Sequence, residues 1–317
     1  MPLSNIADLR QRSVEIIKAG QSPSGAYIAC PTFPVYGFAW LRDGSFVADA
    51  MSRAGEVESA EAFFDWAARI VLERDGKGLA TRYTLDGRDD ESDWPSRQWD
   101  GWGLWLWAVA THSERHLVPL ERWRPALDLA ADFLESVWRE PCTDWWEERV
   151  GLHAATLGCV AAGLEALGRA EASSVRAALD AEADWRPDAS VLALATPLGV
   201  VPAARVLEPV EAAGLVSAGG GVRRHPDDTY YGGGEWLLLT ALLGWVRAAE
   251  GNILDAGDAL DWLAAHATDA GELPEQARDH LLAPDRHDEW VERWGPPPCP
   301  LLWSHAMFLD LALALDG

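Results

Sequence analysis

The sequence is poor in cysteine, in basic residues and in long apolar runs, and each shortage argues against a class of protein. Its four cysteines are scattered along 317 residues without the spacing of metal ligands, so we expect free buried thiols in a reducing compartment. Lysine and arginine number 26 against 50 acidic residues, and a net charge of −24 argues against nucleic acid or an anionic membrane as a partner. No run of about 18 apolar residues occurs, so no transmembrane helix is expected.

The first ten residues also lack a feature that exported proteins show. They contain no basic start followed by an apolar run, so we expect no secretory signal. Together with the cysteine usage, this predicts a cytoplasmic protein.

Tryptophan, by contrast, is abundant, with 18 residues against 7 phenylalanines. Most indoles are expected in the core, but an indole also stacks on the flat face of a pyranose ring and offers an N–H donor. Three tryptophans and four polar residues share the nine positions 94–102. Core helices rarely have this composition, so we expect this segment to face a ligand.

Apolar residues recur three and four positions apart along most of the chain, which predicts many helices and few strands. The polar, acidic segment 76–93 is predicted to be a loop. No linker or change in composition interrupts the pattern, so we predict one all-α domain over residues 1–317, an α/α toroid whose loops build a site on one face. The eleven expected helices are residues 6–19, 44–53, 56–73, 103–116, 120–139, 154–170, 171–182, 202–213, 235–250, 254–266 and 301–315.

Two adjacent glutamates, Glu147 and Glu148, directly follow two tryptophans. One interpretation is a helix N-terminus in which Asp144 is the cap and the glutamates are favoured by the helix dipole. The other is a pocket in which indole bulk removes water from a glutamate and raises its pKa, so that it serves as a general acid. The residues alone do not decide which glutamate would act.

Three further polar segments carry possible ligand groups. Arg42 and Asp43 are neighbours flanked by aromatics, so they offer donors and acceptors to a polyhydroxyl ligand, although Asp43 as a helix cap beside a surface arginine is the local alternative. The segment 223–236 ends in three glycines, but no lysine follows them and the setting is acidic, which argues against a phosphate-binding turn. Glu275 stands in a proline-fixed turn.

In this order, these stretches resemble the glucoamylase family, also called glycoside hydrolase family 15. That family shows an aromatic-x-x-x-W-x-R-D segment, W-x-x-x-Q-x-D-G, W-E-E, R-x-x-x-D-T-Y-Y-x-G, and an E-Q pair ahead of a W-S pair. The resemblance implies an (α/α)6 barrel and an inverting hydrolysis that releases β-glucose from the non-reducing end of an α-glucoside, with no metal and no cofactor. The matching segments are residues 36–43, 94–101, 146–148, 224–233, 275–276 and 303–304.

The resemblance also implies roles for single residues. Glu147 matches the general acid and Glu275 the general base. An inverting enzyme holds such a pair roughly 6.5–9.5 Å apart, to leave room for a water, and keeps the two pKa values apart. Trp145 and Trp146 would raise the pKa of the acid. The residues that match substrate ligands and aromatic walls are Tyr36, Trp40, Arg42, Asp43, Trp94, Glu148, Arg224 and Trp303.

The chain departs from the family pattern in ways that bear on the substrate. It shows no β-sandwich or starch-binding module, and Gly234-Glu235 replaces a turn that usually contains asparagine or proline. An acidic, proline-rich stretch fills residues 285–300. These changes leave the glucose-binding residues intact and alter the leaving-group side, so we expect short oligosaccharides, with isomaltose-type α-1,6 links favoured over maltose-type links. We expect a monomer or a simple homo-oligomer.

Two alternatives from other classes remain open. The acidic run at residues 89–93 is compatible with a Mg²⁺-dependent α-toroid such as a terpene cyclase. A sugar-binding protein without activity on the same barrel is the other. The presence of both Glu147 and Glu275 argues against it, because binding alone does not need an opposed acid and base.

Overall fold

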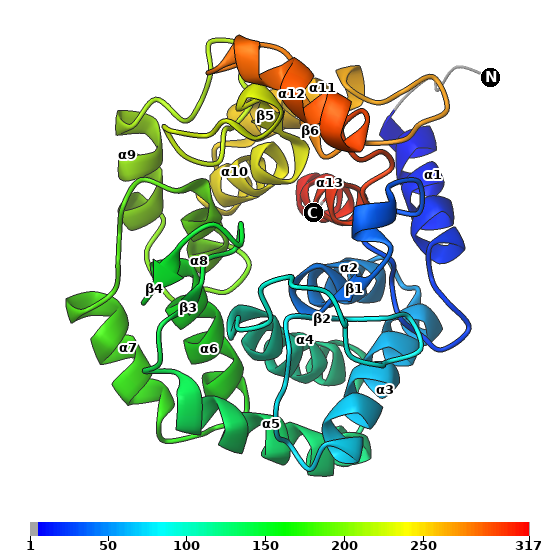
Figure 1. Cartoon of the computed structure of the whole chain (residues 1–317), viewed down its shortest axis with the longest axis vertical. Coiled ribbons are helices and arrows are strands. Elements are labelled where there is room, and N and C mark those ends of the chain that lie inside the picture. The colour runs from blue at the N-terminus through cyan, green and yellow to red at the C-terminus, as the bar shows by residue number, and fades with distance from the viewer. Residues whose placement is uncertain (1–5, 317) are drawn as a thin grey trace. The chain divides into compact units, whose positions relative to one another are not determined.

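The structure, a computed structural model, describes residues 6–316, so residues 1–5 and Gly317 of the predicted domain lie outside the described residues. Within 6–316 the chain forms thirteen α-helices and only two-residue strands, which confirms the all-α prediction (Figure 1). The helices are α1 (Ile6–Ala19), α2 (Leu41–Arg53), α3 (Val57–Glu73), α4 (Asp100–His116), α5 (Arg124–Val137), α6 (Ala154–Ala166), α7 (Ala172–Ala181), α8 (Leu192–Ala195), α9 (Ala204–Ala212), α10 (Leu237–Ala249), α11 (Ile253–Ala265), α12 (Pro284–Trp294) and α13 (Leu302–Leu315).

The strands form three short antiparallel pairs, each of which carries a predicted site segment. They are β1 (Ala39–Trp40) with β2 (Arg82–Tyr83), β3 (Cys142–Thr143) with β4 (Val150–Gly151), and β5 (Glu235–Trp236) with β6 (Gln276–Ala277). Two of the four 3-10 turns also matter for the site, η1 (Pro34–Tyr36) and η4 (Tyr230–Gly232).

All eleven predicted helices are present, but their limits and number differ from the prediction. Helix α2 begins at Leu41, so Arg42 and Asp43 belong to its first turn, and α4 begins at Asp100. Helix α12 occupies much of the acidic, proline-rich stretch 285–300, in which no helix is predicted from the sequence. Pro284 stands in the first turn of α12, where its missing N–H costs no hydrogen bond, and the other prolines follow the helix end.

The chain forms two compact units, and each is described by itself. The first, called here the Glu147 unit, comprises residues 21–29 and 38–185. The second, called the Glu275 unit, comprises residues 30–37 and 186–316 together with 6–20. That residues 1–317 act as one catalytic domain stays a prediction.

In the Glu147 unit, α4 packs between α2 and α6. Helix α6 is apolar nearly all round and its residues 154–164 are all buried, as expected of a core helix. Two glycines let α4 and α6 approach closely. A Cβ at Gly103 would lie 2.5 Å from the carbonyl oxygen of Cys159, and one at Gly163 would lie 2.3 Å from that of Gly103. The outer helices α3, α5 and α7 cover this layer.

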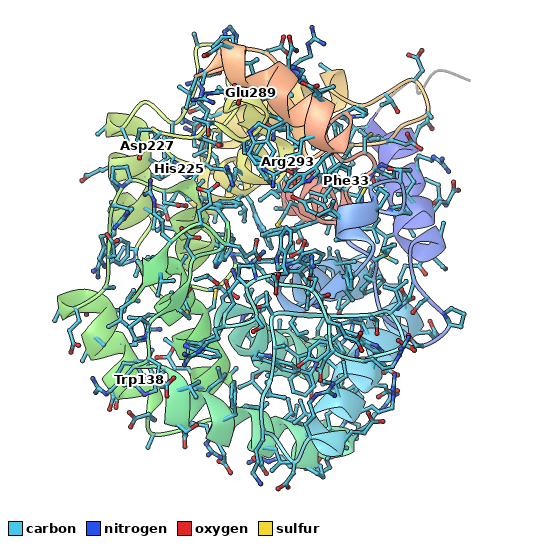
Figure 2. All side chains as sticks on the ribbon, in the orientation of Figure 1. Phe33, Trp138, His225, Asp227, Glu289 and Arg293 are labelled. Atoms are coloured by element: carbon cyan, nitrogen blue, oxygen red, sulfur yellow. The ribbon has the colours of Figure 1, made fainter. Side chains whose placement is uncertain are left out.

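In the Glu275 unit, α10 packs against α11 and α13, and α1 packs against α13. Helix α12 has no buried residue and lies against η4. Its half-buried tryptophans Trp290 and Trp294 contact the ring of Tyr230, and Phe33 meets Trp294 edge-on. Arg293, which Figure 2 labels on α12, stacks over both indoles of this helix. This aromatic layer therefore joins α12 to the two 3-10 turns.

Membrane insertion of a helix was not expected from the sequence. Among residues 6–316, no helix combines the length and the apolar character needed to cross a membrane.

Candidate active site

Glu147 stands at the tip of the turn that joins β3 to β4. The N–H of Arg149 and that of Glu148 both donate to Oδ1 of Asp144, and the N–H of Glu147 donates to the Asp144 carbonyl over 3.1 Å. Asp144 therefore caps a hairpin turn, and the alternative of a helix N-terminus is wrong. The backbone of Glu147 has φ +57°, a left-handed conformation that is uncommon for residues other than glycine. The Asp144 contacts hold the turn in this conformation.

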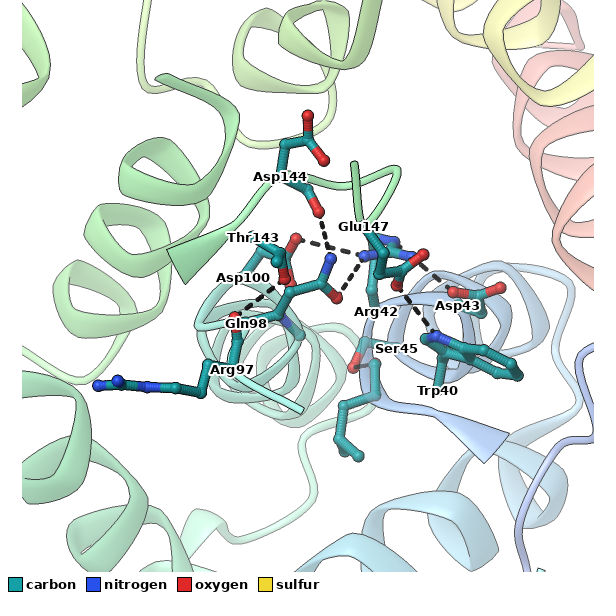
Figure 3. Close-up of polar contacts among 12 residues, drawn as sticks. Trp40, Arg42, Asp43, Ser45, Arg97, Gln98, Asp100, Thr143, Asp144 and Glu147 are labelled. Atoms are coloured by element: carbon teal, nitrogen blue, oxygen red, sulfur yellow. Dashed lines mark hydrogen bonds and ion pairs between the residues drawn. The ribbon is translucent and has the colours of Figure 1, made fainter. Parts of the chain in front are cut away.

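The carboxyl of Glu147 is reached by two donors from the segment that forms β1 and α2 (Figure 3). The indole Nε1 of Trp40 donates to Oε1 over 3.2 Å, and Nη2 of Arg42 lies 3.4 Å from the same oxygen. The Glu147 side chain is only 12% exposed. The arrangement presents the acid to the site while keeping most bulk water away from it.

A buried network fixes Arg42 beneath Glu147. Its Nη1 donates to Oε1 of Gln98 over 2.9 Å and lies 3.4 Å from Oδ2 of Asp100. The amide of Gln98 in turn donates to the carbonyl of Asp144, which ties the arginine to the Glu147 turn. Gly101 lets the first turns of α4 and α2 approach closely, because a Cβ at this position would lie 2.7 Å from the backbone nitrogen of Arg42.

Three carboxyls share the single positive charge of Arg42, and this sets their protonation. Burial raises the pKa of Glu147 to about 7; the charge of Arg42 opposes the rise, and Asp43 and Asp100 add to it. Burial also raises the pKa of Asp43 to about 6 and raises that of Asp100. Near neutral pH, Glu147 is therefore partly protonated, the form that a general acid needs.

Trp94 reaches the Glu147 carboxyl only through Trp40. The two indoles meet edge to face, with ring centroids 5.9 Å apart. Trp94 also lines a polar cavity of about 270 Å³, together with Arg82, Asp90 and Ser92, among others. An indole with polar groups around it is the kind of surface that binds a sugar ring.

The acidic run 89–93 lies beside this cavity. Asp89 accepts from Arg74 over 2.7 Å, and Asp90 accepts from Arg82 over 2.7 Å. Both aspartates are thus bound by arginines, which disfavours the Mg²⁺-binding alternative.

In the Glu275 unit, α13 holds the loop that carries Glu275. The hydroxyl of Ser304 donates to the carbonyl of Pro274 over 2.8 Å, and Nε2 of His305 accepts from the N–H of Leu273 over 3.0 Å. The N–H of Glu275 donates to the carbonyl of Pro298 over 2.8 Å. Ser304 and His305 in the first turn of α13, together with the carbonyl of Pro298, therefore fix the predicted turn.

The carboxyl of Glu275 is 2% exposed and lies among hydroxyl and guanidinium groups. Burial raises its pKa to about 8, while a hydrogen bond with Tyr36, the charge of Arg224 and a hydrogen bond with Tyr230 oppose the rise. The hydroxyls of Tyr36 and Tyr230 lie 3.0 Å apart. Oε2 of Glu275 accepts no hydrogen bond from the residues described.

Arg224 is held rigidly beside this carboxyl. Its Nε donates to Oδ2 of Asp228 over 2.8 Å, and both side chains are buried. The guanidinium stacks over the rings of Tyr230 and Trp236, 5.2 and 5.1 Å from their centroids. A planar cation fixed in this way can donate to sugar hydroxyls without reorganising.

The structure brings most predicted site residues together within their own units. Trp40, Arg42 and Asp43 gather at Glu147, and Tyr36 and Arg224 gather at Glu275. Two other predicted residues are described by their burial. The side chain of Glu148 is exposed on its turn, and Trp303 is buried in the first turn of α13 beside Ser304.

The sequence predicts that the pKa values of Glu147 and Glu275 lie well apart. They do not, because burial raises the pKa of both carboxyls. The tryptophan that bonds Glu147 is Trp40, whereas Trp145 packs against Phe46 and Trp146. Sequence reasoning missed several supporting residues, although each stands inside or directly beside a motif it had singled out. They are Gln98, Asp100, Asp228 and Tyr230.

The comparisons with known proteins agree on one family. Residues 7–93 match the family described as glycosyl hydrolases family 15. The isomaltose glucohydrolase of Kribbella flavida is 40% identical to this chain over 98% of the chain and 93% of its own length. A solved glycosidase variant in complex with glucose is also 40% identical, with a TM-score of 0.92 over 98% of this chain and 97% of the other.

More distant structures share the fold. A bacterial glucoamylase complexed with acarbose has a TM-score of 0.78 at 20% identity, over 97% of this chain and 55% of that one. The fold predicted from the sequence, the (α/α)6 barrel of glucoamylases, is therefore confirmed. With a 40% identical relative matched over nearly its whole length, the chain belongs to glycosyl hydrolase family 15 and is a glycoside hydrolase.

Proposed function

We propose that this enzyme is an inverting exo-α-glucosidase that releases β-D-glucose from the non-reducing end of short α-glucosides. The observation that carries the proposal is the pair Glu147 and Glu275. Both carboxyls are largely removed from solvent, both match the family's acid and base in the sequence resemblance, and each lies beside an arginine fixed by a buried aspartate.

Glu147 is the proposed general acid. Its raised pKa keeps a proton available near neutral pH, and the donors Trp40 and Arg42 stabilise the carboxylate left after that proton moves to the leaving oxygen. The same donors occupy Oε1, which leaves the second oxygen to carry the proton. One oxygen of Glu147 thus accepts hydrogen bonds, while the other carries the proton that is donated in each catalytic cycle.

Glu275 is the proposed general base. Its Oε2 accepts no hydrogen bond within the described chain, so this oxygen suits an attacking water. Burial raises the pKa of Glu275 to about 8, so near neutral pH the ionised fraction of the enzyme is the active one. The hydrogen bond with Tyr36 and the charge of Arg224 enlarge that fraction by favouring the carboxylate form that takes the proton. In an inverting displacement, the water attacks the anomeric carbon opposite the leaving group, and the product is the β-anomer.

Recognition of the terminal glucose is proposed for charged and aromatic residues. Arg42 offers donors, and Oδ2 of Asp43, which accepts no hydrogen bond from described residues, offers an acceptor. The indole faces of Trp40 and Trp94 suit the apolar faces of sugar rings. The remaining proposed ligands are Tyr36, Glu148, Arg224 and Trp303.

The preferred substrate in this proposal is isomaltose or a short isomalto-oligosaccharide. Two observations support it: the relative at 40% identity is an isomaltose glucohydrolase, and α12 covers η4, next to the altered turn Gly234-Glu235.

We further propose one catalytic domain over residues 1–317, a cytoplasmic location and a monomer or simple homo-oligomer. The four cysteines, all free, suit a reducing compartment.

Two measurements test the function. Released glucose is followed with isomaltose, isomaltotriose, maltose, maltotriose and soluble starch; we expect the highest kcat/KM on a disaccharide or trisaccharide, with isomaltose above maltose. A kcat/KM that climbs steadily to starch would overturn the substrate assignment. Proton NMR of the fresh product should show β-glucose before mutarotation, and initial α-glucose would overturn the mechanism. Binding without turnover on every α-glucoside would instead favour a sugar-binding protein.

A further inference from the structure

Arg82, a residue outside the five motifs, is enclosed by aromatic rings. Its guanidinium carbon lies 4.2 Å from the ring centroid of Phe38, 4.6 Å from that of Trp40 and 4.1 Å from that of Trp94. The Arg82 side chain is only 5% exposed. A buried guanidinium in contact with three rings fixes their positions as well as its own, because cation–π contacts gain strength when they are desolvated.

The backbone and a carboxylate hold this guanidinium in place. Arg82 and Trp40 are directly opposite each other in the β1–β2 pair, so the strand register places the arginine beside the indole. Oδ2 of Asp90 accepts from Nε over 2.7 Å and from Nη2 over 2.6 Å, and the Ser92 hydroxyl donates to the same carboxylate. Both ends of the arginine are therefore anchored.

We propose that Arg82 is a positioning residue of the acid site, and that its guanidinium, anchored by Asp90, holds the indole of Trp40 so that Nε1–H points at Oε1 of Glu147. The inference rests on the proposed role of Glu147 as the general acid. In this proposal Arg82 acts on Glu147 through Trp40. The acidic run 89–93, which suggested a metal site in the sequence, thereby has a structural purpose.

The expected effect on Glu147 has a definite sign. The Trp40 hydrogen bond favours the carboxylate form and lowers the pKa of Glu147. The positive charge of Arg82 behind the indole acts in the same direction. Removing Arg82 frees the indole and removes the charge, so the pKa of Glu147 rises further. The other charged groups that act on Glu147, which are Arg42, Asp43 and Asp100, stay in place.

The test is the variant Arg82→Met, in which an unbranched apolar side chain fills the space between the rings. We expect kcat on isomaltose to fall about 10- to 100-fold, as expected when a catalytic group is displaced by about an ångström. A general acid must be protonated, so the basic limb of the pH dependence of kcat should move up by about half a unit to one unit, the effect of one lost hydrogen bond.

Arg74→Met is the matched control. Arg74 also pairs with an aspartate of the acidic run, Asp89, over 2.7 Å, and it stacks on Tyr83 at 4.9 Å. Among the described residues Arg74 contacts neither Trp40 nor Trp94, so this variant loses the same kinds of contact in the same loop. We expect a wild-type kcat and pH profile, with a similar loss in Tm.

The outcomes separate cleanly. A folded Arg82→Met enzyme that keeps the wild-type basic limb overturns the inference. If Arg82→Met does not fold, Arg82→Lys takes its place: it keeps the positive charge but loses the planar contact with the three rings and the paired bonds to Asp90, so the indole is freed and a smaller shift of the same sign is expected, with no shift overturning the inference. Turnover that survives Glu147→Gln would instead overturn the proposed function, whatever the Arg82 variant does.

Discussion

The indole nitrogen of Trp40 donates to Oε1 of Glu147 over 3.2 Å, although 107 positions separate the two residues in the chain. The contact ties an aromatic wall to a carboxyl whose pKa burial has raised. It opposes that rise without abolishing it, so the acid keeps a proton near neutral pH and its anion is stabilised once the proton has left. Most of the expected behaviour of the site follows from this balance.

Glu147→Gln should fold normally and lose most activity. The glutamine oxygen can still accept from Trp40, so the fold is preserved, but the side chain has no proton to give to the leaving oxygen. General acid catalysis supplies about 10²–10⁴-fold, and kcat on isomaltose should fall by that factor. The measurement is steady-state kinetics, with Tm as the check on folding. A folded variant with near wild-type turnover would show that another group is the acid.

The sequence predicted the helices and the residues that carry chemistry much better than the contacts around them. Helical periodicity located eleven helices, because burial of one face imposes a pattern on the residues themselves. Helix α12 was missed because it buries no residue and its sequence is mostly charged, so its short apolar stripe stands among acids and prolines. Its stability comes from Trp290 and Trp294 packing on Tyr230, a contact between distant segments.

The supporting contacts of the site were missed for a related reason. Gln98 and Asp100 stood inside a recognised motif, yet their use in holding Arg42 depends on where α2 and α4 meet. Arg82 carried no signal in the sequence, since an arginine in an acidic loop is ordinarily a solvated charge. Its position between three rings depends on the β1–β2 pairing, which two-residue strands do not reveal in a sequence.

Tyr36→Phe should move the acid limb of kcat/KM to higher pH. The Tyr36 hydrogen bond lowers the pKa of Glu275 against the effect of burial, so its loss raises that pKa. A general base must be ionised, and the acid limb therefore moves up with the pKa, by about half a unit to one unit for one hydrogen bond. The measurement is kcat/KM on isomaltose against pH.

Tyr231→Phe is the control for Tyr36→Phe. The hydroxyl of Tyr231 donates to the Gly295 carbonyl over 2.9 Å, and it is absent from the hydrogen bonds that act on Glu275. This variant should keep the wild-type acid limb. An acid limb that stays in place in Tyr36→Phe, or moves down, would show that Tyr36 does not stabilise the Glu275 carboxylate.

Gly103→Ala should destabilise the enzyme, and Gly257→Ala should stabilise it. Both glycines lie within helices, but a Cβ at Gly103 would stand 2.5 Å from the Cys159 carbonyl oxygen, whereas one at Gly257 meets nothing within 4 Å. Overpacking costs about 1–3 kcal/mol, and glycine to alanine in an open helix position gains about 0.5–1 kcal/mol. Urea unfolding measures both. Equal effects of the two substitutions would show that α4 and α6 are not in close contact.

The unfolding free energy should fall as the pH drops below 6.5, and His305 should account for part of the loss. His305 is fully buried between two partners: Nε2 accepts from the Leu273 N–H and Nδ1 bonds the Ser13 hydroxyl. Burial, with a contribution from Arg12, lowers its pKa to about 3. The unfolded chain therefore binds a proton below its own pKa of about 6.5 that the folded chain does not bind, and the stability present above pH 6.5 is lost as the pH falls towards 3.

Between pH 7 and pH 5, this effect of His305 should lower the unfolding free energy by roughly 2 kcal/mol. His305→Gln keeps an acceptor for Leu273 and a donor for Ser13 but does not titrate, so its unfolding free energy, measured in urea at both pH values, should drop by roughly 2 kcal/mol less than that of the wild type. Equal drops in the two proteins would show that His305 is protonated in the folded enzyme, and that the loop before Glu275 does not depend on its neutral form.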